Sequence, residues 1–368
     1  MRRVLLLGAY GAFGARIAER LAPEPGIELI VAGRSLERAR ETARRLSAKG
    51  CASVVPAGID AATLSGADLL QLKPTLLINA SGPYQNQDYR LARVCIGAGA
   101  HYVDLADARS FVAGIGGLDE EAKRAGVLVV SGASTVPALS AAVIDTYAPQ
   151  LARLDSARIV IAPGNSFDPG LATTQSILST LGRPFAAPLD GRTTVVHGWQ
   201  ELQRRLIPGL GRRWLGACDT PDLQLFPQRY PGLRTVRVFA ALEVGAFHLA
   251  LWGLSGFVRA GILKRPERLA APLLALKRTM RFLGTDVGGM AITLEGEGHS
   301  GERKRVDWSL IARSGHGPFI PAMPSVILGK RLLAGTLTTR GAMPCLGLFT
   351  LDEFLAEVAD LDIEAQVA

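Results

Sequence analysis

A glycine-rich segment directly after a short apolar run constrains this chain more than any other feature. Val4–Leu7 reads as a buried strand, Gly8, Gly11 and Gly14 follow at three-residue spacing, and Ala15–Leu21 has helical periodicity. Glycines let the backbone approach a pyrophosphate, and a helix N-terminus offers N–H groups and positive partial charge. The segment therefore predicts a dinucleotide site. The residues expected to hold the phosphates are Gly8, Tyr10, Gly11, Ala12, Phe13 and Gly14.

The end of the next predicted strand, Ile27–Ala32, distinguishes NADP(H) from NAD(H). Enzymes that use NAD place Asp or Glu there to bind the ribose 2′-hydroxyl. This strand is followed by Arg34 and Ser35, and Glu28 lies at its opposite end. Arg34 can pair with a 2′-phosphate, Ser35 can donate a hydrogen bond, and Arg38 can add charge. The sequence therefore predicts NADP(H), with a solvated arginine as the alternative interpretation of Arg34.

Strand-like and helix-like segments alternate through the first half of the chain, which predicts an α/β fold with a Rossmann-type, doubly wound parallel sheet. The sequence pattern changes near Leu151. Apolar and polar residues alternate in Met290–Glu297 and in Val306–Ala312, as in neighbouring antiparallel strands. We expect an NADP-binding domain over residues 1–140 and an α+β substrate or dimerisation domain with an antiparallel sheet over 141–334. We expect residues 335–368 to pack back on the first domain.

Ligands of such sheets lie beyond the carboxyl ends of the strands. Asp60 is placed to meet an adenine edge, and the small residues Ala80, Ser81, Gly82 and Pro83 let the backbone approach the nicotinamide ribose.

Tyr84 and Asp104 are the candidate catalytic residues. Tyr84 could donate a proton or stack on the nicotinamide, and Asp104 could orient an amine or a water. Alternatively, both shape the pocket. Asn165 and Asp168 could reach the substrate or could simply form turns, which such residues favour.

Four stretches resemble the saccharopine dehydrogenase (NADP-binding) family. The resemblance is strongest over about the first 140 residues and continues weakly through Gly164–Thr174 and Gly341–Cys345. The family implies a Rossmann domain with a second domain, NADP, and hydride transfer. It includes saccharopine reductases, carboxyspermidine-type dehydrogenases and trans-acting enoyl reductases. The stretches that carry the resemblance are Gly8–Gly14, Ala32–Arg34, Asn79–Tyr84 and Ala98–Asp104.

Composition excludes several other classes of protein. The formal net charge is +8, but the arginines are dispersed and no zinc-finger spacing or basic–aromatic pattern appears, so no nucleic-acid partner is expected. The four cysteines form no CxxC pair and the five histidines no cluster, so no metal is expected. Reduced cysteines indicate a cytoplasmic protein. The cysteines are Cys51, Cys95, Cys218 and Cys345.

The stretch Val244–Val258 has no charged residue, and the following residues to Arg281 are strongly basic. Three interpretations are open for residues 244–281: a buried helix followed by a solvated one, peripheral contact with a membrane, or a homodimer contact. The soluble interpretation is favoured, and at fifteen residues the apolar stretch is short for a membrane span.

The sequence thus predicts an NADP(H)-dependent oxidoreductase that transfers hydride to or from a C=N or C=C bond of a small or lipid-like substrate. The alternative is a non-catalytic NADP(H)-binding protein associated with a membrane surface or an assembly.

Overall fold

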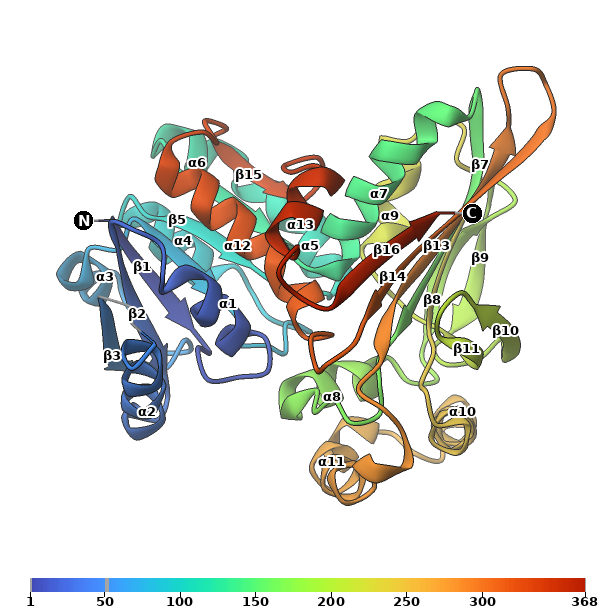
Figure 1. Ribbon diagram of the computed structural model, residues 1–368, viewed down its shortest axis with the longest axis horizontal. Coiled ribbons are helices and arrows are strands. Elements are labelled where there is room, and N and C mark those ends of the chain that lie inside the picture. Colours follow the sequence, from blue (N-terminus) through green and yellow to red (C-terminus); the bar gives the residue numbers. More distant parts are fainter. Residues whose placement is uncertain (1, 50–52, 368) are drawn as a thin grey trace. The chain divides into compact units, whose positions relative to one another are not determined.

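The computed structural model describes residues 2–49 and 53–367, so Cys51 lies outside the described residues. The chain divides into two compact units. Unit 1 contains residues 1–138 and 318–349, and unit 2 contains residues 139–317 and 350–368 (Figure 1).

Unit 1 is built on a seven-stranded parallel sheet. Across the sheet the strands are β15 (Gly341–Pro344), β6 (Leu128–Ser131), β5 (His101–Asp104), β4 (Leu76–Asn79), β1 (Arg2–Leu7), β2 (Ile27–Gly33) and β3 (Val54–Gly58). The helices are α1 (Gly14–Leu21), α2 (Leu36–Ser47), α3 (Gly66–Leu72), α4 (Arg90–Gly97), α5 (Arg109–Gly114), α6 (Asp119–Arg124) and α12 (Phe319–Ala334).

Helices cover both faces of this sheet because its strands are apolar on both faces. Leu5, Leu77 and Tyr102 pack on one side with residues of α3, α4 and α6. Helices α1 and α12 lie together on the other side, as Figure 1 shows. The predicted doubly wound parallel sheet is confirmed.

Unit 2 contains a seven-stranded mixed sheet. Its strands, in order, are β10 (Gln203–Ile207), β11 (Gly211–Ala217), β12 (Thr235–Ala240), β7 (Arg153–Ala162), β13 (Gly288–Glu297), β14 (Arg303–Ala312) and β16 (Ile363–Val367). β8 (Pro184–Leu189) and β9 (Arg192–His197) form a separate hairpin. The helices are α7 (Ser140–Tyr147), α8 (Gly170–Thr180), α9 (Asp222–Arg229), α10 (Gly245–Arg259), α11 (Ala270–Thr279) and α13 (Leu351–Glu357).

The alternation predicted for Met290–Glu297 is present in β13, where Met290, Ile292 and Leu294 are buried and the residues between them are half-buried. β13 pairs antiparallel with both β14 and β7. The second domain therefore contains the expected antiparallel strands, although β7 and β12 run parallel to each other.

The prediction that residues 335–368 pack back on the first domain has the wrong bounds. The returning segment is 318–349, because the buried helix α12 precedes β15 and packs in unit 1. Residues 350–368 belong to unit 2, because β16 completes its sheet by pairing antiparallel with β14.

Candidate dinucleotide site

Four neighbouring strands of unit 1 end at the same level, which sets the edge where the predicted site residues gather. Leu7 is in register with Ala32 of β2 and with Asn79 of β4, and Asn79 is in register with Asp104 of β5. Since these strands are parallel, the residues that follow each of them emerge on one edge of the sheet. The glycine loop, the Arg34 turn and the 80–84 loop therefore share that edge.

Two glycines of the loop are required by its close packing. Gly8 has a φ of +75°, and a Cβ there would lie 2.7 Å from the Ala80 carbonyl oxygen of the loop after β4. A Cβ on Gly14 would lie 2.1 Å from the Gly8 carbonyl oxygen. Any side chain at these positions would push the backbone apart. The turn thus brings the first residue of α1 directly onto the end of β1.

The second glycine has a different role. Gly11 is exposed, and its N–H donates to the Gly8 carbonyl at 2.9 Å. The side chain of the N-cap residue of α1, Phe13, makes no capping hydrogen bond. The segment Tyr10–Phe13 is only partly buried, so its backbone can meet an anion at the positive end of the helix.

Tyr10 connects the glycine loop to the end of β2. Its hydroxyl oxygen accepts a hydrogen bond from the Ser35 N–H at 2.8 Å. The Arg38 guanidinium lies over its ring, 4.3 Å from the centroid. A Cβ on Gly33 would come within 2.5 Å of the Tyr10 hydroxyl, so the small residue at that position admits the ring.

The two polar residues after β2 differ in their contacts. Ser35 is the N-cap of α2, and its hydroxyl oxygen accepts from the Arg38 N–H at 3.3 Å. Arg34 is exposed and makes no ion pair with any described residue. Glu28, at the other end of β2, pairs with Arg3 at 2.6 Å. Position 34, directly after β2, therefore carries a free cation where an NAD enzyme would place a carboxylate.

Asp60 follows β3 and is exposed, and its Oδ1 accepts from the Ala62 N–H at 3.0 Å. The preceding residue, Ile59, donates its N–H to the Gly33 carbonyl at 2.9 Å. Asp60 therefore lies beside the end of β2, on the side expected for an adenine.

The loop after β4 is held from within by Asn79, which is almost fully buried. Its Oδ1 accepts from the Ser81 N–H at 3.1 Å and from the Ser81 hydroxyl at 2.5 Å. The Tyr84 hydroxyl donates to the Asn79 carbonyl at 2.5 Å. These bonds fix the positions of Ala80, Ser81, Gly82 and Pro83 at the edge of the sheet.

Asp104 is fully buried at the end of β5. Its Oδ1 accepts from the N–H groups of Ala106 and Gly132 and from the Ser131 hydroxyl, each at 2.9 Å. Burial raises the pKa of Asp104 to about 6, although these hydrogen bonds act in the opposite direction. The carboxylate joins the turns that follow β5 and β6.

Tyr84 is equally enclosed, with 5% of its surface exposed. Burial, followed by the nearby Asp104 carboxylate, raises its pKa well above the ordinary tyrosine value. Its ring lies 5.7 Å from that of Phe111. Both candidate catalytic side chains thus lie inside unit 1, where they brace the loops of the site.

Asn165 and Asp168 belong to unit 2 and hold a loop in place. The Asn165 amide donates to the Met280 carbonyl at 3.0 Å, and its backbone N–H donates to Glu243 at 2.6 Å. Asp168 accepts from the Gly170 N–H and pairs with Arg278 at 2.8 Å. These contacts match the turn-forming interpretation.

The contacts of Tyr10 and the network around Asn79 and Asp104 were not predicted from the sequence. Tyr102, whose hydroxyl accepts from the Asn79 amide at 3.3 Å, and Ser131 belong to that network. The contacts of Tyr10 with Ser35, of Asn79 with Tyr102 and of Asp104 with Ser131 each join residues more than twenty positions apart, and no local pattern reports such pairing. No group of side chains among the described residues could hold a metal ion.

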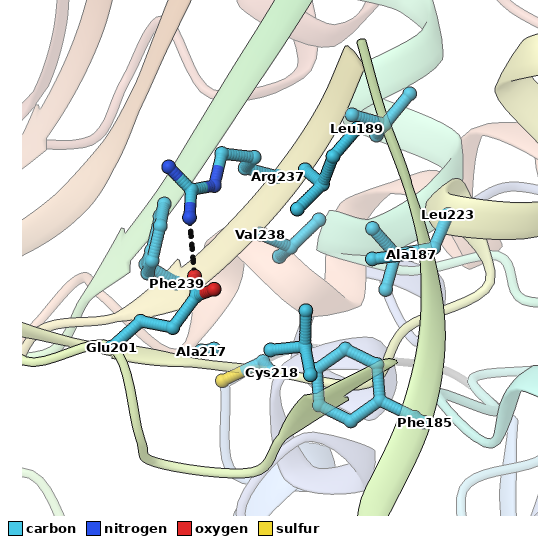
Figure 2. Close-up of a pocket in the computed structure, with 12 residues that line it drawn as sticks. Phe185, Ala187, Leu189, Glu201, Ala217, Cys218, Leu223, Arg237, Val238 and Phe239 are labelled. Carbon is cyan, nitrogen blue, oxygen red and sulfur yellow. Dashed lines mark hydrogen bonds and ion pairs between the residues drawn. The ribbon is translucent and has the colours of Figure 1, made fainter. Parts of the chain in front are cut away.

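A small cavity in unit 2 has a different character (Figure 2). The hairpin strand β8 contributes Phe185, Ala187 and Leu189, which lie across from residues of β12. An ion pair between Arg237 and Glu201 lies at its side. Its volume of about 10 Å³ accommodates no more than a water molecule. It is a packing gap between hairpin and sheet.

Comparisons with known proteins agree with this geometry. Residues 4–130 match the family model for the saccharopine dehydrogenase NADP binding domain. The lipid droplet localized protein of Caenorhabditis elegans is 30% identical over 144 residues, which cover 37% of this chain and 34% of that protein. The match thus spans about a third of the relative's length.

Two solved structures share the fold. Apo saccharopine dehydrogenase (L-Glu forming) from Saccharomyces cerevisiae superimposes with a TM-score of 0.72 at 16% identity, with 100% of both chains covered. Amine dehydrogenase from Mycobacterium smegmatis gives 0.51 at 14% identity, with 94% of both covered. Residues 4–130 therefore form a domain similar to the saccharopine dehydrogenase NADP binding domain, and the cofactor of this domain is a nicotinamide dinucleotide.

Proposed function

We propose that this protein is an NADP(H)-dependent oxidoreductase that moves a hydride between C4 of the nicotinamide and a C=N or C=C bond. The observation that carries the cofactor assignment is Arg34. It is an exposed guanidinium without an ion pair among the described residues, and it follows the strand where an NAD enzyme would place a carboxylate.

The surroundings of Arg34 suit a phosphate on the adenosine ribose. Ser35 keeps its hydroxyl proton available for donation, because its oxygen acts as the acceptor for the Arg38 N–H. Arg38 is held over the Tyr10 ring and adds a second positive charge on the same turn. A 2′-phosphate would meet two guanidinium groups there, while a 2′-hydroxyl would meet a guanidinium at position 34 in place of the carboxylate of NAD enzymes.

The glycine loop and the 80–83 loop are proposed to hold the pyrophosphate and the nicotinamide ribose. Gly8 touches Ala80, so the two loops meet side by side at the sheet edge. The N-terminus of α1 would face the pyrophosphate. Asp60, beyond β3, would lie at the adenine.

Tyr84 and Asp104 are proposed to act as positioning residues for this site. Both are buried and each hydrogen-bonds to the backbone of a loop at the edge. Tyr84 holds the end of β4, and Asp104 joins the turns after β5 and β6. The proton that accompanies the hydride would then come from solvent.

In the reducing direction, NADPH delivers a hydride to one carbon of the C=N or C=C bond. A proton joins the nitrogen or the other carbon, and NADP⁺ is released. The lipid droplet localisation in the name of the curated relative supports a lipid-like substrate for this chemistry.

A second candidate function is a non-catalytic NADP(H)-binding protein. The enclosure of both candidate catalytic side chains favours it, since neither presents its hydroxyl or carboxyl group at the surface of unit 1.

Deuterium transfer from NADPH labelled at C4 separates the two functions. The protein is incubated with labelled NADPH and, in turn, a cyclic imine, a 2-oxo acid with an amine, and an enoyl thioester, and the products are analysed by mass spectrometry. The oxidoreductase proposal predicts deuterium on carbon in at least one product. Tight NADPH binding with no transfer to any acceptor would support the non-catalytic function, and absence of NADPH binding would contradict both.

A further inference from the structure

Helix α10 of unit 2 exposes apolar side chains and buries polar ones. Leu249, Trp252 and Phe257 are 38%, 40% and 54% exposed, whereas His248 and Ser255 are fully buried. Helices on a protein surface normally show the opposite distribution. The part of α10 that faces outward carries no charge before its last residue, Arg259.

The other side of α10 already has a complete set of partners. Leu251, Leu254 and Val258 pack against a buried cluster that includes Trp199 and residues of α8. His248 lies 4.9 Å from the Trp199 ring, and burial lowers its pKa to about 4, so that it is neutral at physiological pH. The exposed apolar side is therefore a second apolar surface, in addition to the one that stabilises unit 2.

Exposed apolar side chains continue beyond the helix. Ile262, Leu276, Phe282 and Leu283 are 73%, 54%, 79% and 46% exposed. Their segment packs on the same buried cluster as α10 through Ala270 and its neighbours. Figure 1 shows α10 and α11 near each other at one end of unit 2. Large apolar side chains exposed at this density on neighbouring elements are typical of an interaction site.

Basic side chains are interspersed with these apolar groups along the segment. Arg259, Lys264, Arg265, Arg268 and Arg281 are exposed and make no ion pair with the residues that the structure describes. The acid among them, Glu267, pairs with Arg183 at 3.6 Å.

Two further cations of the segment have internal partners. Lys277 donates to the Asn165 carbonyl at 2.8 Å, and Arg278 pairs with Asp168. The five exposed cations, in contrast, are available to an anionic partner.

We propose that this surface binds the face of a membrane that contains anionic lipids. The apolar–basic surface, as we name it, consists of Leu249, Trp252, Phe257, Ile262, Leu276, Phe282 and Leu283 with Arg259, Lys264, Arg265, Arg268 and Arg281. Its apolar groups would enter the boundary between headgroups and acyl chains, and its cations would meet lipid phosphates.

Charge and composition together favour a lipid surface over other occupants. A nucleic acid would satisfy the cations but would leave the aliphatic and aromatic side chains without apolar partners. A second copy of the chain in symmetric contact through this segment would bring its five exposed cations toward those of the partner, with like charges facing each other. Among the described residues no helix is long and apolar enough to cross a bilayer, so the contact is peripheral.

Vesicle binding of the full-length protein tests the proposal. We expect flotation with vesicles of phosphatidylcholine and phosphatidylglycerol, weaker binding to phosphatidylcholine alone, and loss of binding at high salt. The double substitutions Phe257→Ser/Phe282→Ser and Lys264→Gln/Arg265→Gln should each weaken binding by about tenfold or more.

Matched control variants replace exposed side chains of the same kinds outside the apolar–basic surface. Val195→Ser/Leu206→Ser removes two apolar side chains that are 65% and 68% exposed, and Arg124→Gln/Arg192→Gln removes two exposed charges. Both control variants should bind vesicles like the unmodified protein. Equal losses in controls and test variants would overturn the proposal, because they would show general attraction of a basic protein.

Fluorescence locates the contact. Trp252 is partly exposed, while Trp199 and Trp308 are only 2% exposed. Brominated lipids should quench the emission of the unmodified protein, and Trp252→Phe should remove most of that quenching. Absence of binding to anionic vesicles would refute the proposal. So would a stable dimer in sedimentation that Phe257→Ser/Phe282→Ser dissolves, since a second copy would then cover the surface.

Discussion

Tyr10 joins the two segments that would hold the adenosine half of the cofactor. Its hydroxyl accepts from the Ser35 N–H, and its ring supports Arg38. A residue in this position acts on the phosphate through its neighbours. Its effect should therefore appear in the preference between NADPH and NADH.

Tyr10→Phe tests this role, because it keeps the ring under Arg38 and removes the hydroxyl. Loss of one hydrogen bond of about 1 kcal/mol should weaken NADPH binding roughly fivefold, with a smaller change for NADH. Titration of each cofactor by fluorescence gives both constants. Tyr89→Phe is the matched control. The Tyr89 hydroxyl donates to the Phe111 carbonyl at 2.8 Å, and this bond does not involve the glycine loop. Equal weakening of NADPH and NADH by Tyr10→Phe would rule out this role.

The buried Asp104 carboxyl should make stability depend on pH. Burial raises its pKa in the folded protein from 3.8 to about 6, so the folded state holds the proton more tightly than the unfolded chain. The stability that protonation provides is complete below about pH 4 and is lost as pH rises through 6. The loss is at most about 3 kcal/mol, for about two pKa units at 1.4 kcal/mol each.

Asp104→Asn keeps the oxygen that accepts from Ala106, Ser131 and Gly132 and removes the titration. The free energy of unfolding of the variant minus that of the unmodified protein should therefore be larger at pH 7.5 than at pH 4.5. Urea denaturation at the two values measures the difference. If this difference in the free energy of unfolding is the same at both pH values, Asp104 does not titrate as its burial implies.

At the scale of elements, the glycine turn and the strands at the sheet edge were predictable. β1 and β4 contain the short apolar runs Val4–Leu7 and Leu76–Ile78, and small residues follow each strand, which local sequence displays directly. The elements that were not predicted lack such a signal. In α12, twelve of sixteen residues are buried, so no polar face produces helical periodicity. β15 has four residues and gains its place only by pairing with β6.

The same limit applies to the site. Arg34 and the glycines could be predicted because their roles depend on position after a strand. The buried hydrogen bonds that Asp104 accepts from Ser131 and Gly132 could not, because they join turns that only the folded sheet brings together. Likewise, the sequence left open whether the charge-free stretch of α10 is a buried helix, a membrane contact or a dimer contact, and the structure shows that one side of it is covered.

Gly14→Ala tests the packing of the turn against the helix. The added Cβ would lie 2.1 Å from the Gly8 carbonyl oxygen, so backbone must move. We expect a loss of about 3 kcal/mol or more in the free energy of unfolding, together with loss of cofactor binding. Gly97→Ala in α4 is the control, since nothing lies within 4 Å of its Cβ, and it should be neutral or stabilising by up to about 1 kcal/mol. A stable Gly14→Ala protein that still binds NADPH would contradict the proposed turn.

For the whole molecule, one family domain supplies the dinucleotide site and the second unit supplies a mixed sheet with an apolar–basic surface. The cytoplasmic location and the homodimer predicted from the sequence stay predictions. The identity of the substrate also stays a prediction. In an imine the nitrogen would receive the proton, and in an enoyl compound the second carbon would receive it. The proposed function depends on the cofactor being NADP(H).

Dissociation constants of NADPH and NADH for the unmodified protein and for Arg34→Ala test that claim most directly. We predict that the unmodified protein prefers NADPH and that Arg34→Ala weakens NADPH binding by about tenfold to a hundredfold, the range expected for a charge-assisted hydrogen bond. NADH binding should change little, and Arg44→Ala, an exposed arginine further along α2, should change neither. Equal effects of Arg34→Ala on both cofactors, or a preference of the unmodified protein for NADH, would contradict the account.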